Sequence, residues 1–148
     1  MTETRSRQPE LLFPGLAPFY AAVSDLWYPM IRIVFGGRLF MHGMKKIAVG
    51  VGGVTFYFSK NGFEPAVVFA YTAILLETVG GICVTLGLFT RFFAAALAIE
   101  LGIALLFINF SNGFISGAYE FLLGIVMFAI ALHGGGRYSL DRAIGKEL

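Results

Sequence analysis

Four long apolar runs dominate this 148-residue chain, and each contains only a few charged side chains. A hydrocarbon core about 30 Å thick needs roughly 20 helical residues to cross it. Four ranges meet that length, namely 27–48, 66–88, 91–110 and 117–134. Their apolar residues are continuous rather than alternating with polar ones, which argues against the strands of an outer-membrane barrel. The sequence therefore predicts an all-α integral membrane protein, a bundle of four transmembrane helices.

The composition agrees with this fold class and excludes others. Hydrophobic residues make up 57% and charged residues 14% of the chain, against averages of about 45–50% and about 25% for soluble domains. The formal net charge is only +2, and no basic stripe with interleaved aromatics occurs, so we predict no nucleic-acid partner. Cys83 is the only cysteine, which leaves no internal disulfide and no thiolate cluster, and we expect it simply to pack.

The N-terminal 25 residues predict a short interfacial helix. Arg5 and Arg7 precede an apolar stretch as in a signal peptide, but Pro14 and Pro18 interrupt it and no clean cleavage site follows. A helix lying on the membrane surface fits the flanking aromatic residues better. The predicted parts are a cytoplasmic or interfacial segment over 1–25, a transmembrane domain over 26–136 and a cytoplasmic tail over 137–148.

Basic residues near the ends of the predicted spans give an orientation. Six lie on the side of the termini and three on the other, so the positive-inside rule places both termini in the cytoplasm. The aromatic and glycine-rich segment 50–64 is then a long outer loop that could close a cavity. Residues 111–113 form the second outer turn, and the glycines 134–136 end the last helix.

Ionisable residues inside the apolar runs are the candidates for a ligand site or charge network. They are Arg32, Arg38, His42, Glu77, Glu100 and Glu120. An ionisable group at the bilayer centre costs about 2.5–3.5 kcal/mol, so these groups are expected to be paired or neutral. Arg38, Glu77 and Glu100 lie near the midpoints of their spans, and pairing of Arg38 with Glu77 or Glu100 is the first expectation. Two interpretations stay open, a structural bridge that fixes helix register and a polar cavity for a small ligand or protons.

Small residues at helical spacing indicate which faces pack against protein. Glu77 shares a face with small residues, and so does Glu120, so both should point into the protein. The residues beside Glu77 are Ala70, Ala73, Gly81 and Val84, and those beside Glu120 are Gly117, Gly124 and Ala131. The stripe Ala94, Ala98, Gly102 lies almost opposite Glu100 and is a helix-packing or oligomer face, which could serve a homodimer.

Cofactor signals are sparse. His42 and His133 are expected at opposite membrane sides, so no bis-histidine haem pair is available. We predict no haem, metal or nucleotide site and assign no catalytic residue. The cofactor is therefore unknown. A quinone pocket could use the sixteen phenylalanines, although composition alone does not show one.

Three blocks of sequence resemble the DoxX family of small membrane proteins. The first is Arg32-Ile-Val-Phe-Gly36 with Phe40, Gly43 and Lys46-Ile47. The second and most specific is Glu77-Thr-Val-Gly-Gly81 with Leu86-Gly-Leu-Phe-Thr-Arg91. The third combines Gly117-Ala-Tyr-Glu120 with the stretch from Gly134 to Asp141. The resemblance implies a four-helix membrane bundle with recurrent polar positions at Arg32, Glu77 and Glu120. Arg38, His42 and Glu100 are departures from the family pattern.

The resemblance also implies a redox context. Relatives include the small membrane part of a thiosulfate:quinone oxidoreductase and a scaffold that gathers superoxide dismutase and a sulfurtransferase. The leading hypothesis is a membrane subunit or anchor that holds partner proteins, such as soluble redox enzymes or a membrane complex, at a bacterial or archaeal cytoplasmic membrane. The alternative is a subunit of a quinone-linked oxidoreductase in which Arg32 and Arg38 bind the ligand. A small transporter is third, because no paired broken helices are evident.

Overall fold

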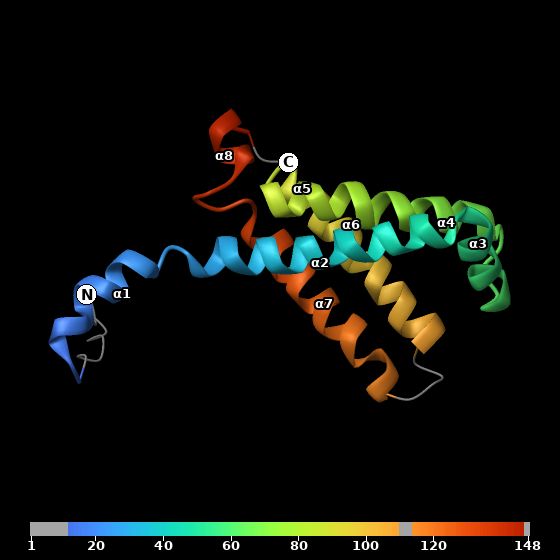
Figure 1. Cartoon of the computed structure of the whole chain (residues 1–148), viewed down its shortest axis with the longest axis horizontal. Helices are drawn as coiled ribbons and strands as arrows, with labels where there is room; N and C mark the ends of the chain where they lie inside the picture. Colours follow the sequence, from blue (N-terminus) through green and yellow to red (C-terminus); the bar gives the residue numbers. More distant parts are fainter. Residues whose placement is uncertain (1–11, 110–113, 147–148) are drawn as a thin grey trace, which may run out of the picture.

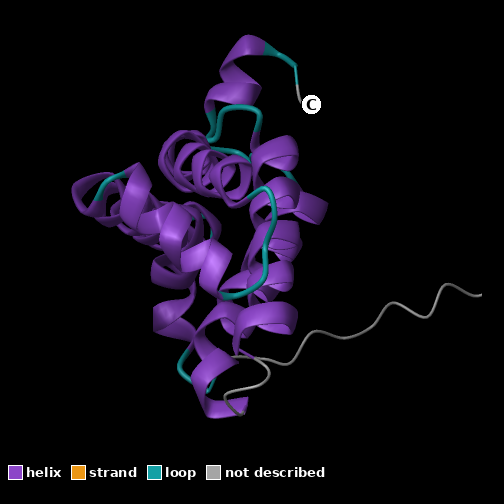
Figure 2. Ribbon diagram, turned by 90° about the vertical axis from the view of Figure 1, so that its right-hand side faces the viewer, coloured by secondary structure: helices purple, strands orange, loops and turns teal. Residues whose placement is uncertain are grey.

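The computed structural model describes residues 12–109 and 114–146, and every regular element within them is helical (Figure 2). The elements, in order, are η1 (Pro14–Leu16), α1 (Ala17–Val23), α2 (Trp27–Val49), α3 (Val51–Lys60), α4 (Ala66–Leu75), η2 (Leu76–Gly80), α5 (Gly81–Leu86), α6 (Thr90–Ala104), η3 (Leu105–Asn109), α7 (Phe114–His133) and α8 (Leu140–Ile144). The all-α fold class is therefore confirmed for the described residues. Elements η2 and η3 are single π-helical turns that continue the preceding α-helices.

Two of these helices are long and apolar enough to cross a membrane. They are the continuous helices Ala66–Leu86 and Thr90–Ile108. Helix α2 covers the first apolar range, but basic side chains interrupt it, whereas the apolar stretch Gly117–His133 of α7 is shorter. All four predicted ranges thus contain helices, while their arrangement as four transmembrane spans stays a prediction.

The helices form two crossing layers (Figure 1). Helix α2 packs along α5 and η2, and α6 pairs with α7 on the other side of the molecule. Helix α3 folds back over α4 at one end. Apolar side chains from the layers meet in one core, which includes Leu39, Val84, Leu97, Met127 and Ile130. Close packing of these side chains provides dispersion contacts that hold the crossing layers together.

Glycines set how α2 lies against the second long helix. A Cβ atom at Gly36 would lie 2.6 Å from Oγ1 of Thr85, and one at Gly81 would lie 2.6 Å from the backbone nitrogen of Phe40. Further along, a Cβ atom at Gly43 would lie 2.7 Å from the backbone nitrogen of Thr78. The two backbones therefore touch at these positions, as in small-residue packing of membrane helices. The contacts fix the register of α2 against η2 and α5.

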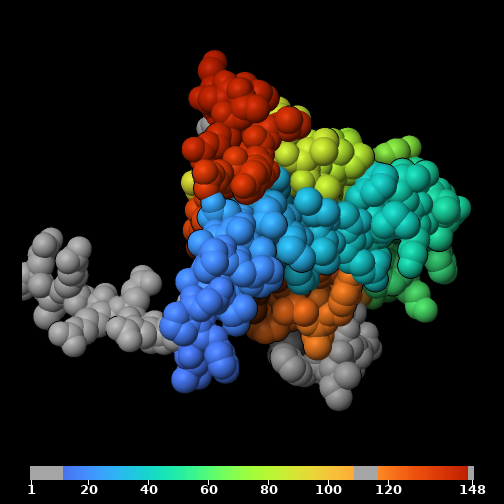
Figure 3. Space-filling model, turned by 60° about the vertical axis from the view of Figure 1, so that its left-hand side comes forward, coloured from blue at the N-terminus to red at the C-terminus, as the bar shows by residue number. Residues whose placement is uncertain are grey.

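The C-terminal segment is docked against the start of α6. Asp141 is buried, and its carboxylate accepts hydrogen bonds from the backbone nitrogens of Phe89 (2.6 Å) and Thr90 (2.9 Å) and from the hydroxyl of Thr90 (2.6 Å). Ser139 caps α8 by accepting a hydrogen bond from the backbone of Arg142. Figure 3 shows the C-terminal segment lying against the start of α2. The described part of 137–148 is therefore an ordered element, because one carboxylate satisfies the first donors of α6.

Two loop predictions have mixed outcomes. Segment 50–64, which was predicted to be an outer loop, is largely helical, since α3 spans Val51–Lys60. The expectation of a loop is therefore wrong there. Gly134 has a φ of 86° and ends α7 as predicted. The second outer turn, 111–113, lies outside the described residues. Helix α1 is present and exposed, while its placement on a membrane surface stays a prediction.

Candidate functional site

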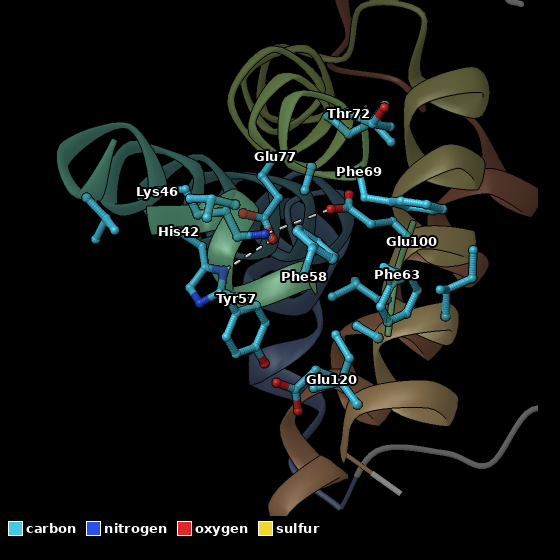
Figure 4. A pocket seen from close by; sticks show the side chains of 18 of the residues that line it. His42, Lys46, Tyr57, Phe58, Phe63, Phe69, Thr72, Glu77, Glu100 and Glu120 are labelled. Carbon is cyan, nitrogen blue, oxygen red and sulfur yellow. Dashed lines mark hydrogen bonds and ion pairs between the residues drawn. The ribbon is translucent and has the colours of Figure 1, made fainter. Parts of the chain in front are cut away.

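A cavity of about 760 Å³ lies between α2, α3, the α4–η2 helix and α6. Its wall is mostly apolar, and its polar residues gather from several helices (Figure 4). The polar and charged lining residues are His42, Lys45, Lys46, Tyr57, Lys60, Thr72, Glu77, Glu100 and Glu120. Its size suits a small organic molecule, since ligand pockets are usually about 300–1,000 Å³.

Glu77 forms the deepest polar contact of the cavity. Glu77 is only 3% exposed, and its Oε1 lies 3.0 Å from Nζ of Lys46 and 3.2 Å from Nδ1 of His42. The π-helical turn η2 contains Glu77, and such turns are frequent at functional sites because they re-aim side chains. The expected small neighbours Ala70 and Ala73 are buried on the same face. The inward orientation of Glu77 is therefore confirmed.

Glu100 shares the same cation. Oε1 of Glu100 lies 4.0 Å from Nζ of Lys46, so one ammonium stands between two carboxylates. Figure 4 shows the side chain of Glu100 directed toward this cluster. Glu120 also lines the cavity but belongs to α7 and stands apart from the cluster. Three carboxylates therefore face one chamber, and Lys46 alone bridges two of them.

Aromatic rings form part of the cavity wall beside Glu77 and Glu100. The ring of Phe63 lies 5.1 Å from that of Phe69 and 5.5 Å from that of Phe58. Edge-to-face packing at such distances stabilises a rigid surface. Helix α3 adds Tyr57, whose pKa is raised by burial and, secondarily, by the carboxylate of Glu120. Segment 50–64 therefore contributes to the cavity wall, through a helix rather than a loop, and its closing of the cavity stays a prediction.

The expectation that Arg38 pairs with Glu77 or Glu100 is wrong. Glu77 and Glu100 contact Lys46, whereas Arg38 is exposed and its guanidinium lies 5.2 Å from the centre of the Tyr119 ring. The prediction had aligned the midpoints of the spans. The glycine contacts instead set the register, and they bring the C-terminal half of α2 beside η2. Lys46 is one of the three basic residues that the sequence places on the side away from the termini, yet its long apolar stem lets the ammonium reach inward.

Arg32 lies away from the cavity. It is 2% exposed, and its guanidinium donates hydrogen bonds to the backbone oxygens of Gly135 and Tyr138. The hydroxyl of Tyr28 donates to Gly134 in the same region. The candidate residues therefore divide into two groups. His42, Glu77, Glu100 and Glu120 line the cavity, while Arg32 and Arg38 do not.

The small-residue stripe of α6 is partly used inside the protein. Ala94 is fully buried in the core, and Ala98 packs against it. A Cβ atom at Gly102 would meet nothing within 4 Å. The stripe therefore serves helix packing at Ala94 and Ala98, and its use in a homodimer stays a prediction. Glu100 nevertheless points into the fold, so it does not need a cation from a second copy.

Other site residues were missed by sequence reasoning. Lys46 lies in the first block of the family resemblance but was given no role there, and Tyr57 lies in the segment that was predicted to be a loop. Asp141 lay within a recognised block, but no partner could be assigned to it from spacing. Within the described residues, no three His, Cys, Asp or Glu side chains are placed to hold a metal ion.

Comparison with known proteins agrees with the sequence blocks. The DoxX family model matches residues 27–109, more than half of the chain. The chain belongs to the DoxX family. The DoxX match covers α2 through η3 and therefore every cavity residue except Glu120. A curated protein of Bacillus subtilis (strain 168), described as "Putative oxidoreductase CatD", is 28% identical over 118 residues, which cover 79% of this chain and 86% of the relative. No solved structure matches the chain.

Proposed function

We propose that this DoxX protein is a membrane-embedded subunit of a redox-enzyme system and that its cavity binds a quinone-class molecule. The observation that carries the proposal is the cavity itself, an apolar and aromatic chamber with one charged cluster at Glu77, Lys46 and Glu100. A quinone has the matching shape, an apolar body with a polar ring. The similarity to a protein described as an oxidoreductase supports the same class of function.

The proposal includes a membrane arrangement. The helix α2, the helix Ala66–Leu86, the helix Thr90–Ile108 and α7 are its four spans, in a bacterial or archaeal cytoplasmic membrane. Both termini face the cytoplasm, and α3 lies on the outer side. Labelling of single cysteines introduced at Lys60 and Lys146 in a Cys83→Ser chain tests this topology. Labelling of both positions from the same side would contradict it.

Quinone binding is tested by extracting purified protein. We expect protein isolated in mild detergent to retain a quinone in stoichiometric amount. Ala104 is a half-buried cavity residue, and Ala104→Phe should fill the chamber and lower the recovered quinone at least severalfold. Ala129→Phe, at an exposed position of α7, is the matched control. Recovery no higher than in an unrelated membrane protein would refute the proposal.

A second candidate function is an anchor for soluble redox enzymes. The observation that favours it is the docked C-terminal segment, which exposes Tyr138, Leu140 and Ile144 beside a shallow hollow of about 490 Å³. An ordered surface with exposed apolar side chains is typical of protein interaction sites. Leu140→Glu should then abolish co-purification of a redox enzyme without affecting bound quinone. Unchanged co-purification would remove the anchor hypothesis from this surface.

A further inference from the structure

The polar cluster of the cavity has more hydrogen-bond acceptors than donors. Glu77, Glu100 and Glu120 each have a buried Oε2 atom without a hydrogen-bond partner among the described residues. Glu77 is itself 97% buried, since its exposed fraction is 3%. Buried carboxylate oxygens are normally hydrogen-bonded, because leaving them without a partner costs desolvation free energy. The cavity is therefore suited to a ligand that donates hydrogen bonds.

Two protein donors contact the other oxygens of these carboxylates. The ammonium of Lys46 contacts Oε1 of both Glu77 and Glu100, and the ring of His42 contacts Oε1 of Glu77. The second oxygens are left over, because one ammonium cannot surround two carboxylates. A ligand whose head only accepts hydrogen bonds, such as the carbonyl of a quinone, would have to compete with these carboxylates for Lys46.

The overall charge of the lining favours a neutral ligand. Three carboxyl groups and three ammonium groups line the chamber, with His42 in addition. The carboxylates are Glu77, Glu100 and Glu120, and the ammonium groups are Lys45, Lys46 and Lys60. A cationic ligand would be attracted by the carboxylates and repelled by the lysines. An anionic ligand would be attracted by the lysines and repelled by the carboxylates. A neutral hydroxyl group satisfies an orphan acceptor without adding a charge to this balance.

The apolar part of the lining accepts a ring and a hydrocarbon chain. Phe58, Phe63 and Phe69 present packed aromatic surfaces next to the cluster (Figure 4). Glu120 is separated from the Glu77–Lys46–Glu100 cluster, so acceptors stand at two places in one chamber. A ring with two hydroxyl groups could use both.

We propose that the cavity binds the reduced, hydroquinone form of its ligand more tightly than the quinone form, with one ligand hydroxyl donating to Oε2 of Glu77 or Glu100 and the other to Oε2 of Glu120. This inference rests on the proposed function and adds the redox form that the site selects. Preferential binding of the reduced form stabilises it and therefore raises the reduction potential of the bound couple. For a two-electron couple, a tenfold preference corresponds to about 30 mV.

The test uses the purified full chain in lipid nanodiscs, under anaerobic conditions, with decylubiquinone and decylubiquinol as probes. The dissociation constant of each form is measured by equilibrium dialysis, and the potential of the bound probe by redox titration. We expect the quinol to bind at least about tenfold more tightly than the quinone, and the reduction potential of the bound probe to rise by at least about 30 mV.

Variants identify the acceptors. Glu100→Gln and Glu120→Gln should each reduce the preference severalfold, since an amide offers one acceptor and places donors where the ligand donates. Glu64→Gln is the matched control, because Glu64 is exposed, does not line the cavity and accepts hydrogen bonds from the hydroxyl of Ser59 and the backbone nitrogen of Ala66. Glu77→Gln is informative only where fluorescence of Trp27 shows a native fold, so the other two variants carry the test.

The outcomes separate the two proposals. Equal affinity for both forms, or tighter binding of the quinone, overturns the hydroquinone preference while leaving quinone binding intact. Binding of neither form overturns both. A lipophilic cation, tetraphenylphosphonium, is the third probe. If tetraphenylphosphonium binds more tightly than the quinol and displaces it, the carboxylates bind a cation and the hydroquinone preference is again overturned.

Discussion

Substitution of two adjacent glycines in α2 tests the helix register on which the site depends. Gly36 lies against the second long helix, where an added Cβ atom would be 2.6 Å from Oγ1 of Thr85, 2.9 Å from its backbone nitrogen and 3.0 Å from the backbone oxygen of Gly81. At Gly37, an added Cβ atom would meet nothing within 4 Å. Gly36→Ala and Gly37→Ala therefore make the same chemical change on one helix in opposite surroundings.

The magnitude follows from two terms. Alanine is favoured over glycine in a helix by about 1 kcal/mol, and this gain is common to both variants. Gly36→Ala also overpacks an interface, at a cost of about 1–3 kcal/mol. Two of its three close contacts are backbone atoms, which cannot rotate away, so the helices must separate and lose dispersion contacts along their length. We expect Gly36→Ala to be less stable than Gly37→Ala by about 2–3 kcal/mol, near the upper end of that range.

The assay is reversible unfolding in mixed micelles of dodecyl maltoside and increasing SDS. Trp27 is the only tryptophan of the chain and begins α2, so its fluorescence reports the relevant helix. Wild-type protein and both variants are compared in one titration. If the two variants unfold within about 0.5 kcal/mol of each other, which is the usual uncertainty of such comparisons, the close approach of α2 and α5 is refuted.

Three further predictions concern single charged or polar groups. Asp141→Asn should destabilise the protein by about 2–4 kcal/mol, because hydrogen bonds to a charged acceptor contribute about 1.5–3 kcal/mol each, and faster proteolysis of the C-terminal segment would show it. The control is Asp25→Asn, which removes one partner of an exposed ion pair and should change stability by less than about 1 kcal/mol. A similar loss of stability in Asp141→Asn and Asp25→Asn would contradict the role of the buried Asp141. Lys46→Gln should cost about 3–5 kcal/mol by leaving Glu77 without its cation, whereas the exposed neighbour Lys45→Gln should cost little, and equal SDS-unfolding midpoints would refute the bridge. Burial raises the pKa of Tyr57, so the folded state favours its neutral form and its contribution to stability should be complete below about pH 10. This contribution should be lost as the pH rises through the folded-state pKa. Tyr57→Phe removes this late-titrating phenol, so a phenolate titration that ends at the same pH in wild type and variant would contradict the prediction.

The sequence predicted local structure well, because hydrophobic periodicity and glycine placement are local signals. The apolar ranges are helical, and the small face of Glu77 is buried at Ala70, Ala73 and Val84 as expected. Gly134 ends α7 where the glycine run predicts it. These features depend on residues within a few turns of one another, which composition and spacing can report.

Contacts between distant helices were harder to predict. Arg38 was placed beside Glu77 by matching the middle of each span, but the chain aligns its helices where Gly36, Gly43 and Gly81 permit contact. Asp141 caps α6 across fifty residues of sequence, and no periodic pattern marks such a bond. Helix α3 was hidden because its glycines lower helix propensity, while packing on α4 stabilises it.

The two interpretations left open by the sequence for Glu77 describe different atoms of the same carboxylate. Oε1 forms the bridge to Lys46 and His42, which links α2 to η2 and so fixes register. Oε2 takes no part in that bridge and has no hydrogen-bond partner among the described residues. A purely structural bridge would gain from a second donor at this oxygen, because burial without one is costly. The π-helical turn at η2 instead holds the residue at the cavity wall, so one side chain can both fix the helices and present an acceptor to a ligand.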